Sequence, residues 1–312
     1  MNRIIKKRLI IISLIIIILI FSTGCSRLSA QKRGNSETAG GGVLNDKIYQ
    51  GTKGITMKFM KNLPPRRIYD NNDLSLVLEV KNEGAHKTDG KVFLTGYDPV
   101  ILRGIDNNKR FRTLEGKNKF NLLGDIETIE FKSNIIRLPE GSDSYNPKFL
   151  ATMCYQYETL SNPVVCIDPK FYDVSVEDKA CLVRDVSMGG GQGAPIGVNI
   201  VRVDSVKDKA HFRIEISNFA KGKVVRHNDC PFNLKYDDLN KIQYQVKMAG
   251  QRPEKCSPSR EVRLVNGKGT IFCSFNIPSQ NQYAYSTPLE IKLNYGYMDS
   301  IAQEVEIVKI PK

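Results

Sequence analysis

Cys25 is the residue whose surroundings point most directly to a chemical modification. Four cations lie within the first eight residues, and an apolar run follows over residues 9–21, interrupted only by Ser13. The small residues 22–24 come directly before Cys25. A basic, an apolar and a small-residue segment in this order are typical of a secretory signal peptide. We therefore predict a signal peptide over residues 1–24, cleavage before Cys25, and a lipid on the Cys25 sulfur that holds the chain to a membrane.

Two alternatives to lipidation stay open. The apolar run is about two-thirds of the ~20 residues that a membrane-spanning helix needs, which favours a cleaved signal, but Ile4 and Ile5 could extend it into an uncleaved anchor. Cleavage without lipid is the second alternative. The segment resembles a lipoprotein lipobox in its small residues and its Gly24-Cys25 end, and it departs from that pattern at Ser22, where Leu, Val or Ile is usual.

The other six cysteines indicate disulfide chemistry. An even number of cysteines in an exported chain predicts three bridges, although six cysteines allow fifteen connectivities. Cys154 and Cys166 flank the turn-like residues 160–163 between two strand-like runs, and a second turn-like segment separates Cys256 from Cys273. Each of these two pairs is spaced to meet across a hairpin. We therefore expect the bridges Cys154–Cys166, Cys256–Cys273 and, by elimination, Cys181–Cys230.

A basic stretch is the strongest candidate for contact with an anionic partner. The whole chain carries a formal charge of +13, and without the signal peptide 42 Lys and Arg stand against 33 acids, or +9. Positive surfaces attract lipid headgroups and acidic polymers. Because lysines at a sheet edge also block edge-to-edge pairing, a solvated edge is the alternative. The candidate anion-contacting residues are Arg103, Lys109, Arg110, Arg112, Lys117 and Lys119.

The sequence lacks the common motifs of enzymatic chemistry. Its three histidines, His86, His211 and His227, have no metalloprotease spacing, and neither a nucleophile elbow nor a phosphate-binding loop occurs. We therefore expect no catalytic residue, no metal site and no cofactor. A pair of carboxylates that meets only in the folded chain would still allow a hydrolase, so this alternative stays open.

Alternating apolar and polar residues predict the elements that position these side chains. Residues 74–80, 212–217 and 289–297 each follow a period of two, as strands do. Turn residues separate many short strand-like runs, and long helical periods are scarce. The predicted fold class is therefore all-β. Residues 25–53 are polar and have no apolar period, which is typical of a flexible tether.

The two halves of the chain look like copies of one unit. Four-residue segments recur at offsets of 136 and 140 residues, which indicates an internal repeat. Each copy is expected to close with a hairpin, the second turning at residues 298–300. We predict two tandem β-sandwich domains, residues 54–175 and 196–312, and a Gly-rich connector over residues 176–195 that acts as a hinge. The aligned segments are Glu79-Val80-Lys81-Asn82 with Glu215-Ile216-Ser217-Asn218, and Tyr155-Gln156-Tyr157-Glu158 with Tyr295-Gly296-Tyr297-Met298.

The run from Leu76 to Gly84, followed by residues 91–95, resembles the extracellular Ig-like modules of prokaryotic surface proteins. It is similar to the cell-adhesion-related (CARDB-like) module, in which a strand ends at Asn-x-Gly before the next strand starts. The second copy departs from this pattern, because Phe219 and Ala220 follow its Asn218. The chain also has no Trp, which antibody-type domains pack on a disulfide. The resemblance implies tandem Ig-like β-sandwiches on a lipid-anchored surface protein, and it implies no catalytic residue.

The expected function is that of a non-enzymatic, membrane-anchored, extracytoplasmic binding or structural protein of the cell envelope. Its expected partners are the membrane, through the N-terminal lipid, and anionic envelope polymers or other envelope proteins. Nucleic acid is not an expected partner in this compartment. An accessory lipoprotein subunit of an export, pilus or conjugation assembly is the first alternative. An envelope hydrolase with a carboxylate site is the second.

Overall fold

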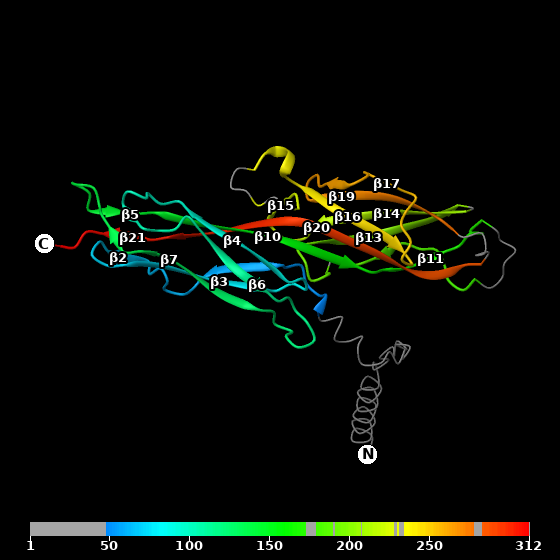
Figure 1. Ribbon diagram of the computed structural model, residues 1–312, viewed down its shortest axis with the longest axis horizontal. Helices are drawn as coiled ribbons and strands as arrows, with labels where there is room; N and C mark the ends of the chain where they lie inside the picture. The colour runs from blue at the N-terminus through cyan, green and yellow to red at the C-terminus, as the bar shows by residue number, and fades with distance from the viewer. Residues whose placement is uncertain are drawn as a thin grey trace, which may run out of the picture. The chain divides into compact units, whose positions relative to one another are not determined.

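The computed structural model describes residues 48–172, 179–189, 191–206, 208–227, 230, 234–277 and 283–311, and its fold is all-β (Figure 1). Gly40–Lys312 form one compact unit. The predicted signal peptide, Cys25 and most of the predicted tether lie outside the described residues. In the part of the chain that is described, no helix has both the length and the hydropathy needed to cross a membrane.

The largest sheet combines strands from both halves of the chain. Six of its eight strands follow the order β18-β16-β20-β10-β4-β6, and two more, β11 and β15, pair along β20. The strands of this sheet are β4 (Thr88–Thr95), β6 (Asn108–Leu114), β10 (Lys148–Ser161), β11 (Val164–Ile167), β15 (Lys223–Val225), β16 (Lys241–Met248), β18 (Glu261–Arg263) and β20 (Tyr285–Glu304).

Four smaller sheets complete the fold. A three-stranded sheet, β1-β3-β7, belongs to the first half, and a five-stranded sheet, β12-β13-β14-β19-β17, belongs to the second. Their strands are β1 (Ile55–Phe59), β3 (Leu74–Asn82), β7 (Ile126–Ser133), β12 (Val186–Ser187), β13 (Ile196–Val206), β14 (Lys209–Asn218), β17 (Lys255–Ser257) and β19 (Lys268–Asn276). Short pairings add β2 (Arg67–Tyr69), β21 (Glu306–Val308) and β9 (Ser144–Tyr145) in one sheet, and β5 (Leu102–Arg103) with β8 (Ile135–Ile136) in another. A 3-10 turn, η1, covers Tyr236–Asp238.

The alternating sequence pattern explains how these sheets pack. In β3, Leu74, Leu76, Leu78 and Val80 are fully buried, while the polar residues between them are partly exposed. A period of two sends alternate side chains to opposite faces of a strand. The inward faces form one hydrophobic cluster that runs through both halves of the chain.

Strands β10 and β20 join the two halves at the middle of the eight-stranded sheet. They pair antiparallel over all fourteen residues of β10, and β11 continues along the same partner, from Val164 opposite Pro288 to Ile167 opposite Tyr285. Figure 1 shows β10 in green beside β20 in red. The chain therefore does not reverse at residues 160–163. Both predicted closing hairpins are wrong, because each long strand finds its hydrogen-bonding partner in the other half instead of in its own next segment.

Equivalent hydrogen bonds occur at the two segments that the sequence aligns. Asn82 ends β3 and Asn218 ends β14. The Oδ1 atom of each accepts a hydrogen bond from the backbone N–H two residues further on, at 3.1 and 3.2 Å. The same atoms accept hydrogen bonds from the hydroxyls of Tyr157, at 3.3 Å, and Tyr297, at 3.2 Å. Each half therefore fixes the end of one strand to a tyrosine of its longest strand.

The antiparallel pairing of β10 with β20 has a local two-fold centre. Tyr155 lies opposite Tyr297 and Tyr157 opposite Tyr295, with Gln156 between them. The hydroxyls of Tyr155 and Tyr295 accept backbone hydrogen bonds from the first residues of β1 and β13, at 3.2 and 3.4 Å. The four tyrosines therefore connect the eight-stranded sheet to β1 and β3 in the first half, and to β13 and β14 in the second half.

The disulfides correct two of the three expected pairings. Cys256–Cys273 is confirmed, because these residues lie directly opposite each other on β17 and β19, with Cα atoms 4.2 Å apart. Cys154 bonds instead to Cys230, and Cys166 bonds to Cys181. The expected pairs Cys154–Cys166 and Cys181–Cys230 are wrong because β10 and β11 run on in one direction, which keeps Cys154 and Cys166 from facing each other across a hairpin.

The end of the Gly-rich connector is packed against the first half of the chain. Residues 192–195 are buried, and Gly193 has a φ of +64°, which favours glycine. The Gly193 N–H donates to the Gly51 oxygen at 3.0 Å, and the Gly193 oxygen accepts from the Ala85 N–H at 2.8 Å. This part of the connector is therefore held in place, in contrast to the hinge that the sequence suggested.

Candidate functional site

The outer face of the five-stranded sheet carries the candidate site. Ala210, Phe212 and Ile214 of β14 point to the core, so His211 and Arg213 between them point outward. Neighbouring strands present their residues in two cross-strand rows, and directly opposite side chains have Cβ atoms ~5 Å apart. The first row is Asp204, His211, Ser274 and Lys255, and the second row is Arg202, Arg213, Phe272 and Ser257.

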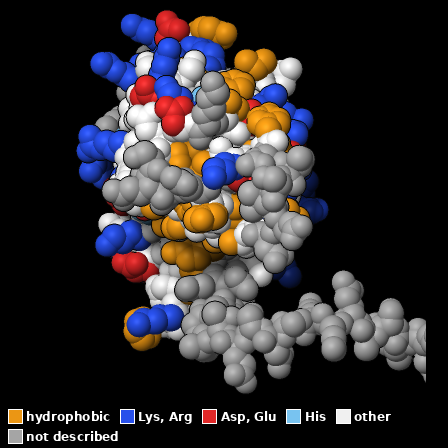
Figure 2. All heavy atoms as spheres, turned by 90° about the vertical axis from the view of Figure 1, so that its right-hand side faces the viewer, with side chains coloured by type: hydrophobic (Ala, Val, Ile, Leu, Met, Phe, Trp, Pro, Cys, Tyr) orange, Lys and Arg blue, Asp and Glu red, His pale blue; other side chains and the backbone are white. Residues whose placement is uncertain are grey.

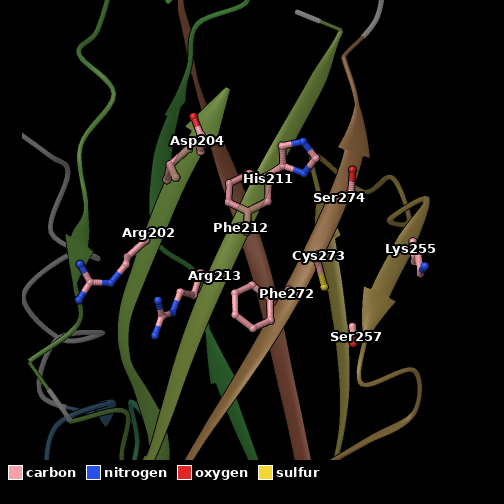
Figure 3. A pocket seen from close by; sticks show the side chains of 11 residues that line it. Arg202, Asp204, His211, Phe212, Arg213, Lys255, Ser257, Phe272, Cys273 and Ser274 are labelled. Carbon is pink, nitrogen blue, oxygen red and sulfur yellow. The ribbon is translucent and has the colours of Figure 1, made fainter. Parts of the chain in front are cut away.

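A cavity of about 450 Å³ lies over these rows (Figure 3). It is lined by residues of β13, β14, β19 and β17. In Figure 3 the imidazole of His211 lies between Asp204 and Ser274, and the ring of Phe272 stands on the neighbouring strand. Phe272 is 51% exposed, and the Arg213 guanidinium lies 5.7 Å from the centre of its ring. The cavity therefore combines an accessible aromatic surface with cationic and hydroxyl groups.

The charges around this cavity are partly compensated. Arg202 forms ion pairs with Asp185 at 2.9 Å and with Glu215 at 3.2 Å, and Arg213 lies 3.5 Å from the same Glu215 carboxylate. These contacts orient both guanidinium groups along the face of the sheet. Of the residues that line the cavity, Asp204 is the sole carboxylate, against Arg202, Arg213 and Lys255. The lining therefore favours an anionic group over a cationic one.

Asp204, His211 and Ser274 occupy one row and invite comparison with a serine hydrolase. A catalytic triad needs hydrogen bonds from serine to histidine and from histidine to the carboxylate. Among the described residues, no hydrogen bond joins any two of these three side chains. The Ser274 Oγ atom is buried and has no hydrogen-bond partner in the structure. This geometry does not assemble a nucleophile.

Ion pairs within the first half engage two of the six predicted anion-contacting cations. The Arg112 guanidinium contacts Asp125 at 2.8 Å and lowers the pKa of that carboxyl through a hydrogen bond. Lys109 lies 3.4 Å from Asp106. Arg110 lies opposite another cation, Lys91 of β4. Along β6, Arg110 therefore lies between two cations that have ion-pair partners, Lys109 and Arg112.

The remaining predicted cations lie at the two ends of that stretch. Arg103 lies on β5, and its Nε atom donates to the backbone oxygen of Val100. Lys117 and Lys119 belong to the loop that follows β6, and the Lys119 Nζ atom lies 4.8 Å from the centre of the Phe120 ring. Lys117 and Lys119 are therefore neighbours in one loop, whereas Arg103 belongs to the β5–β8 pair. Their role in anion contact stays a prediction.

No cluster of three or more metal-ligating side chains occurs within the described residues. A further apolar surface lies at the end of the molecule that Figure 2 faces, where hydrophobic side chains gather in the middle and Lys and Arg lie toward the edge. Val164 of β11, which lies toward this end in Figure 1, is exposed. We assign no site to this surface.

Comparison with known proteins adds little to this geometry. No family model and no curated protein matches the chain. Among solved structures, the chain is similar to the secreted serine protease VesC from Vibrio cholerae, with 9% identity and a TM-score of 0.20. The similarity covers 84% of this chain, which spans about half (53%) of the VesC chain. A TM-score this low carries no argument about activity.

The cavity beside His211 was not predicted from the sequence. One signal was present in residues 271–275, where Ile271, Cys273 and Phe275 mark the buried face of a strand. Phe272 lies between these buried residues, so its side chain is on the polar face of the strand. A large aromatic residue on that face indicates a contact surface. The neighbours of Phe272 come from segments up to 70 residues away, so their convergence was not readable from the sequence.

Proposed function

We propose that this protein is a non-enzymatic, extracytoplasmic binding protein of the cell envelope, held to the membrane by a lipid on Cys25. Three disulfides within the described residues suit an oxidising, extracytoplasmic compartment. The proposal includes the tandem Ig-like interpretation of residues 54–175 and 196–312. Equivalent Asn–Tyr hydrogen bonds in the two ranges support it.

The proposed ligand is a segment of an acidic polysaccharide, bound on the outer face of the five-stranded sheet. The observation that carries this proposal is the exposed Phe272 ring beside Arg213, with Lys255 on the next strand. An aromatic face packs against the apolar face of a sugar ring, and cations bind its carboxylates through charge-assisted hydrogen bonds.

Calorimetric titration of the full chain with polygalacturonate, and with uncharged dextran of similar length, tests the proposal. We expect saturable binding of polygalacturonate only, and a loss of at least fivefold in affinity for Phe272→Ala. Val265→Ala is the matched control, because Val265 is an exposed apolar residue outside the cavity lining. Equal affinity of both variants, or equal binding of dextran, would contradict the proposed site. Stable partner subunits that co-purify from native membranes would favour the accessory-subunit alternative.

A further inference from the structure

The loop between β6 and β7, residues 115–125, holds large apolar side chains in solvent. Phe120 is 88% exposed and Leu123 is 73% exposed, and Leu122 is exposed as well. Single exposed apolar residues are ordinary on protein surfaces, whereas a cluster of them is typical of an interaction site. We call residues 115–125 the apolar loop.

Polar groups of the apolar loop fix its backbone. Asn118 Oδ1 accepts a hydrogen bond from the Phe120 N–H at 2.9 Å, and Asn121 Oδ1 accepts one from the Leu123 N–H at 3.2 Å. Asn118 and Asn121 also exchange backbone hydrogen bonds at 2.9 and 3.1 Å. Asparagine side chains that bond to the backbone two residues further on stabilise tight turns. Phe120 and Leu123 are therefore held outward by an ordered turn.

Cations accompany the apolar side chains. Lys117 and Lys119 lie in the apolar loop, and Lys119 reaches over the Phe120 ring. Of the two acids in the loop, Asp125 is paired with Arg112, which leaves Glu115 as its exposed acid. Apolar side chains at the boundary between headgroups and acyl chains, with lysines at the phosphates, are typical of peripheral membrane contacts.

The apolar loop lies beside the N-terminal end of the described chain. Lys117 Nζ donates to the Gln50 backbone oxygen at 3.4 Å, and the Lys117 N–H donates to the Gly84 oxygen at 2.7 Å. Residues 26–47 separate Cys25 from Ile48. At ~3.5 Å per residue, these residues span at most about 80 Å. A membrane anchor at Cys25 would therefore keep the apolar loop within reach of the same bilayer, at a high effective concentration.

We propose that the apolar loop contacts an anionic bilayer, with Phe120 and Leu123 inserted at the headgroup boundary and Lys117 and Lys119 against the lipid phosphates. This inference rests on the proposed membrane attachment, which supplies the bilayer. Loop contact is a second membrane signal beside the lipid, and two signals give more stable attachment than one.

Fluorescence of a single introduced tryptophan tests the insertion, because the chain contains no Trp. The full chain with Phe120→Trp is bound to vesicles of phosphatidylglycerol and phosphatidylcholine that carry brominated acyl chains. We expect a blue shift and at least twofold quenching of this tryptophan. Tyr236→Trp is the control, since Tyr236 lies in η1 and is 77% exposed, and it is expected to show neither effect.

The Cys25→Ala form allows membrane binding by the apolar loop to be measured without the lipid. In this form, Phe120→Ser with Leu123→Ser is expected to weaken vesicle partitioning at least tenfold. Lys117→Gln with Lys119→Gln is expected to weaken it about tenfold at low salt and little at high salt, because salt screens exposed charges. Lys109→Gln with Arg110→Gln is the matched control, with an expected change below twofold.

Four outcomes decide between the claims. Quenching at position 120, in a chain that floats with vesicles, supports contact of the apolar loop with the bilayer. If the Cys25→Ala form then floats equally well, the proposed lipid anchor alone is overturned. Flotation without quenching overturns contact of the apolar loop with the bilayer and leaves the lipid anchor in place. If neither form floats, both the loop contact and the lipid anchor are overturned. A tryptophan at position 120 that is shielded without vesicles, in a chain that sediments as a dimer, overturns bilayer contact in favour of a second copy.

Discussion

The hydroxyl of Tyr157 donates a hydrogen bond to the side-chain oxygen of Asn82 at 3.3 Å, across 75 residues of sequence. The backbone N–H of His86, four residues after Asn82, donates to the same hydroxyl at 3.2 Å. Tyr297 repeats both contacts with Asn218 and Gly222 in the second half. One tyrosine therefore holds the end of a strand and the turn that follows it, once in each half of the chain.

Asn82→Ala is expected to lower the free energy of unfolding by about 2–4 kcal/mol. Asn82 is fully buried, and its Nδ2 atom donates to the His86 and Leu114 oxygens at 2.8 and 3.0 Å. Each buried partner left without a hydrogen bond costs about 1–3 kcal/mol. Urea unfolding with the disulfides intact measures the change. Asn276→Ala, at an exposed strand end, is the control and should stay within ~0.5 kcal/mol; equal stability of the two variants would contradict the role of Asn82.

Alkaline unfolding is expected between about pH 10 and pH 12. Burial raises the pKa of Tyr297 to about 12 from an ordinary value of 10.0, and burial also raises the pKa of Tyr155, Tyr157 and Tyr295. A folded-state pKa above the unfolded value gives stability that is complete below pH 10 and lost as the pH rises. Tyrosinate absorbance should therefore rise together with the loss of the near-ultraviolet dichroism signal. Ionisation of all tyrosines while that signal persists would contradict this prediction.

Peptide mapping without reduction should recover Cys154–Cys230, Cys166–Cys181 and Cys256–Cys273. The first bridge closes the longest loop, with a sequence separation of 76 against 15 and 17 for the others. In the chain-entropy model, its loss costs about 4.5 kcal/mol, and the loss of either short bridge costs about 3 kcal/mol. Thermal unfolding of the paired Cys→Ala variants gives this order. Recovery of a Cys154–Cys166 peptide from the native envelope protein would contradict it.

Lys255→Gln is expected to weaken polygalacturonate binding three- to tenfold at low salt, through the loss of one cation at the cavity. The difference from the unaltered chain should shrink between 50 mM and 500 mM salt, because the screening length falls from about 14 Å to about 4 Å. Lys223→Gln, at an exposed position on β15, is the matched control and should bind normally. A salt-independent loss would indicate a conformational effect of Lys255→Gln.

Ser274→Ala is expected to leave the free energy of unfolding unchanged or to raise it by up to about 1 kcal/mol. Its Oγ atom is buried and unpartnered, and removal of such a group relieves a desolvation cost. Affinity for polygalacturonate should fall less than in Phe272→Ala. Ester or peptide hydrolysis by the unaltered chain that disappears in Ser274→Ala would instead favour the hydrolase alternative.

The sequence by itself determined the all-β class and the alternating strands at residues 74–80, 212–217 and 289–297, because these depend on local alternation. The Asn-ending strands at Asn82 and Asn218 and the tyrosine pairs could be aligned without any structure. The Cys256–Cys273 bridge was also predictable, since the two cysteines are 17 residues apart and lie on strands that pair with each other.

Only the tertiary structure decided which strands pair across the middle of the molecule. Residues 160–163 have turn-like chemistry, yet the chain runs straight on, because β20 offers a continuous row of hydrogen-bonding partners about 130 residues away. Because of this strand pairing, Cys154 bonds to Cys230 and Cys166 bonds to Cys181. The cavity at Phe272 depends on the register of four strands in the same way. Long-range register is set by the packing of whole faces against each other, and no local pattern in the sequence encodes it.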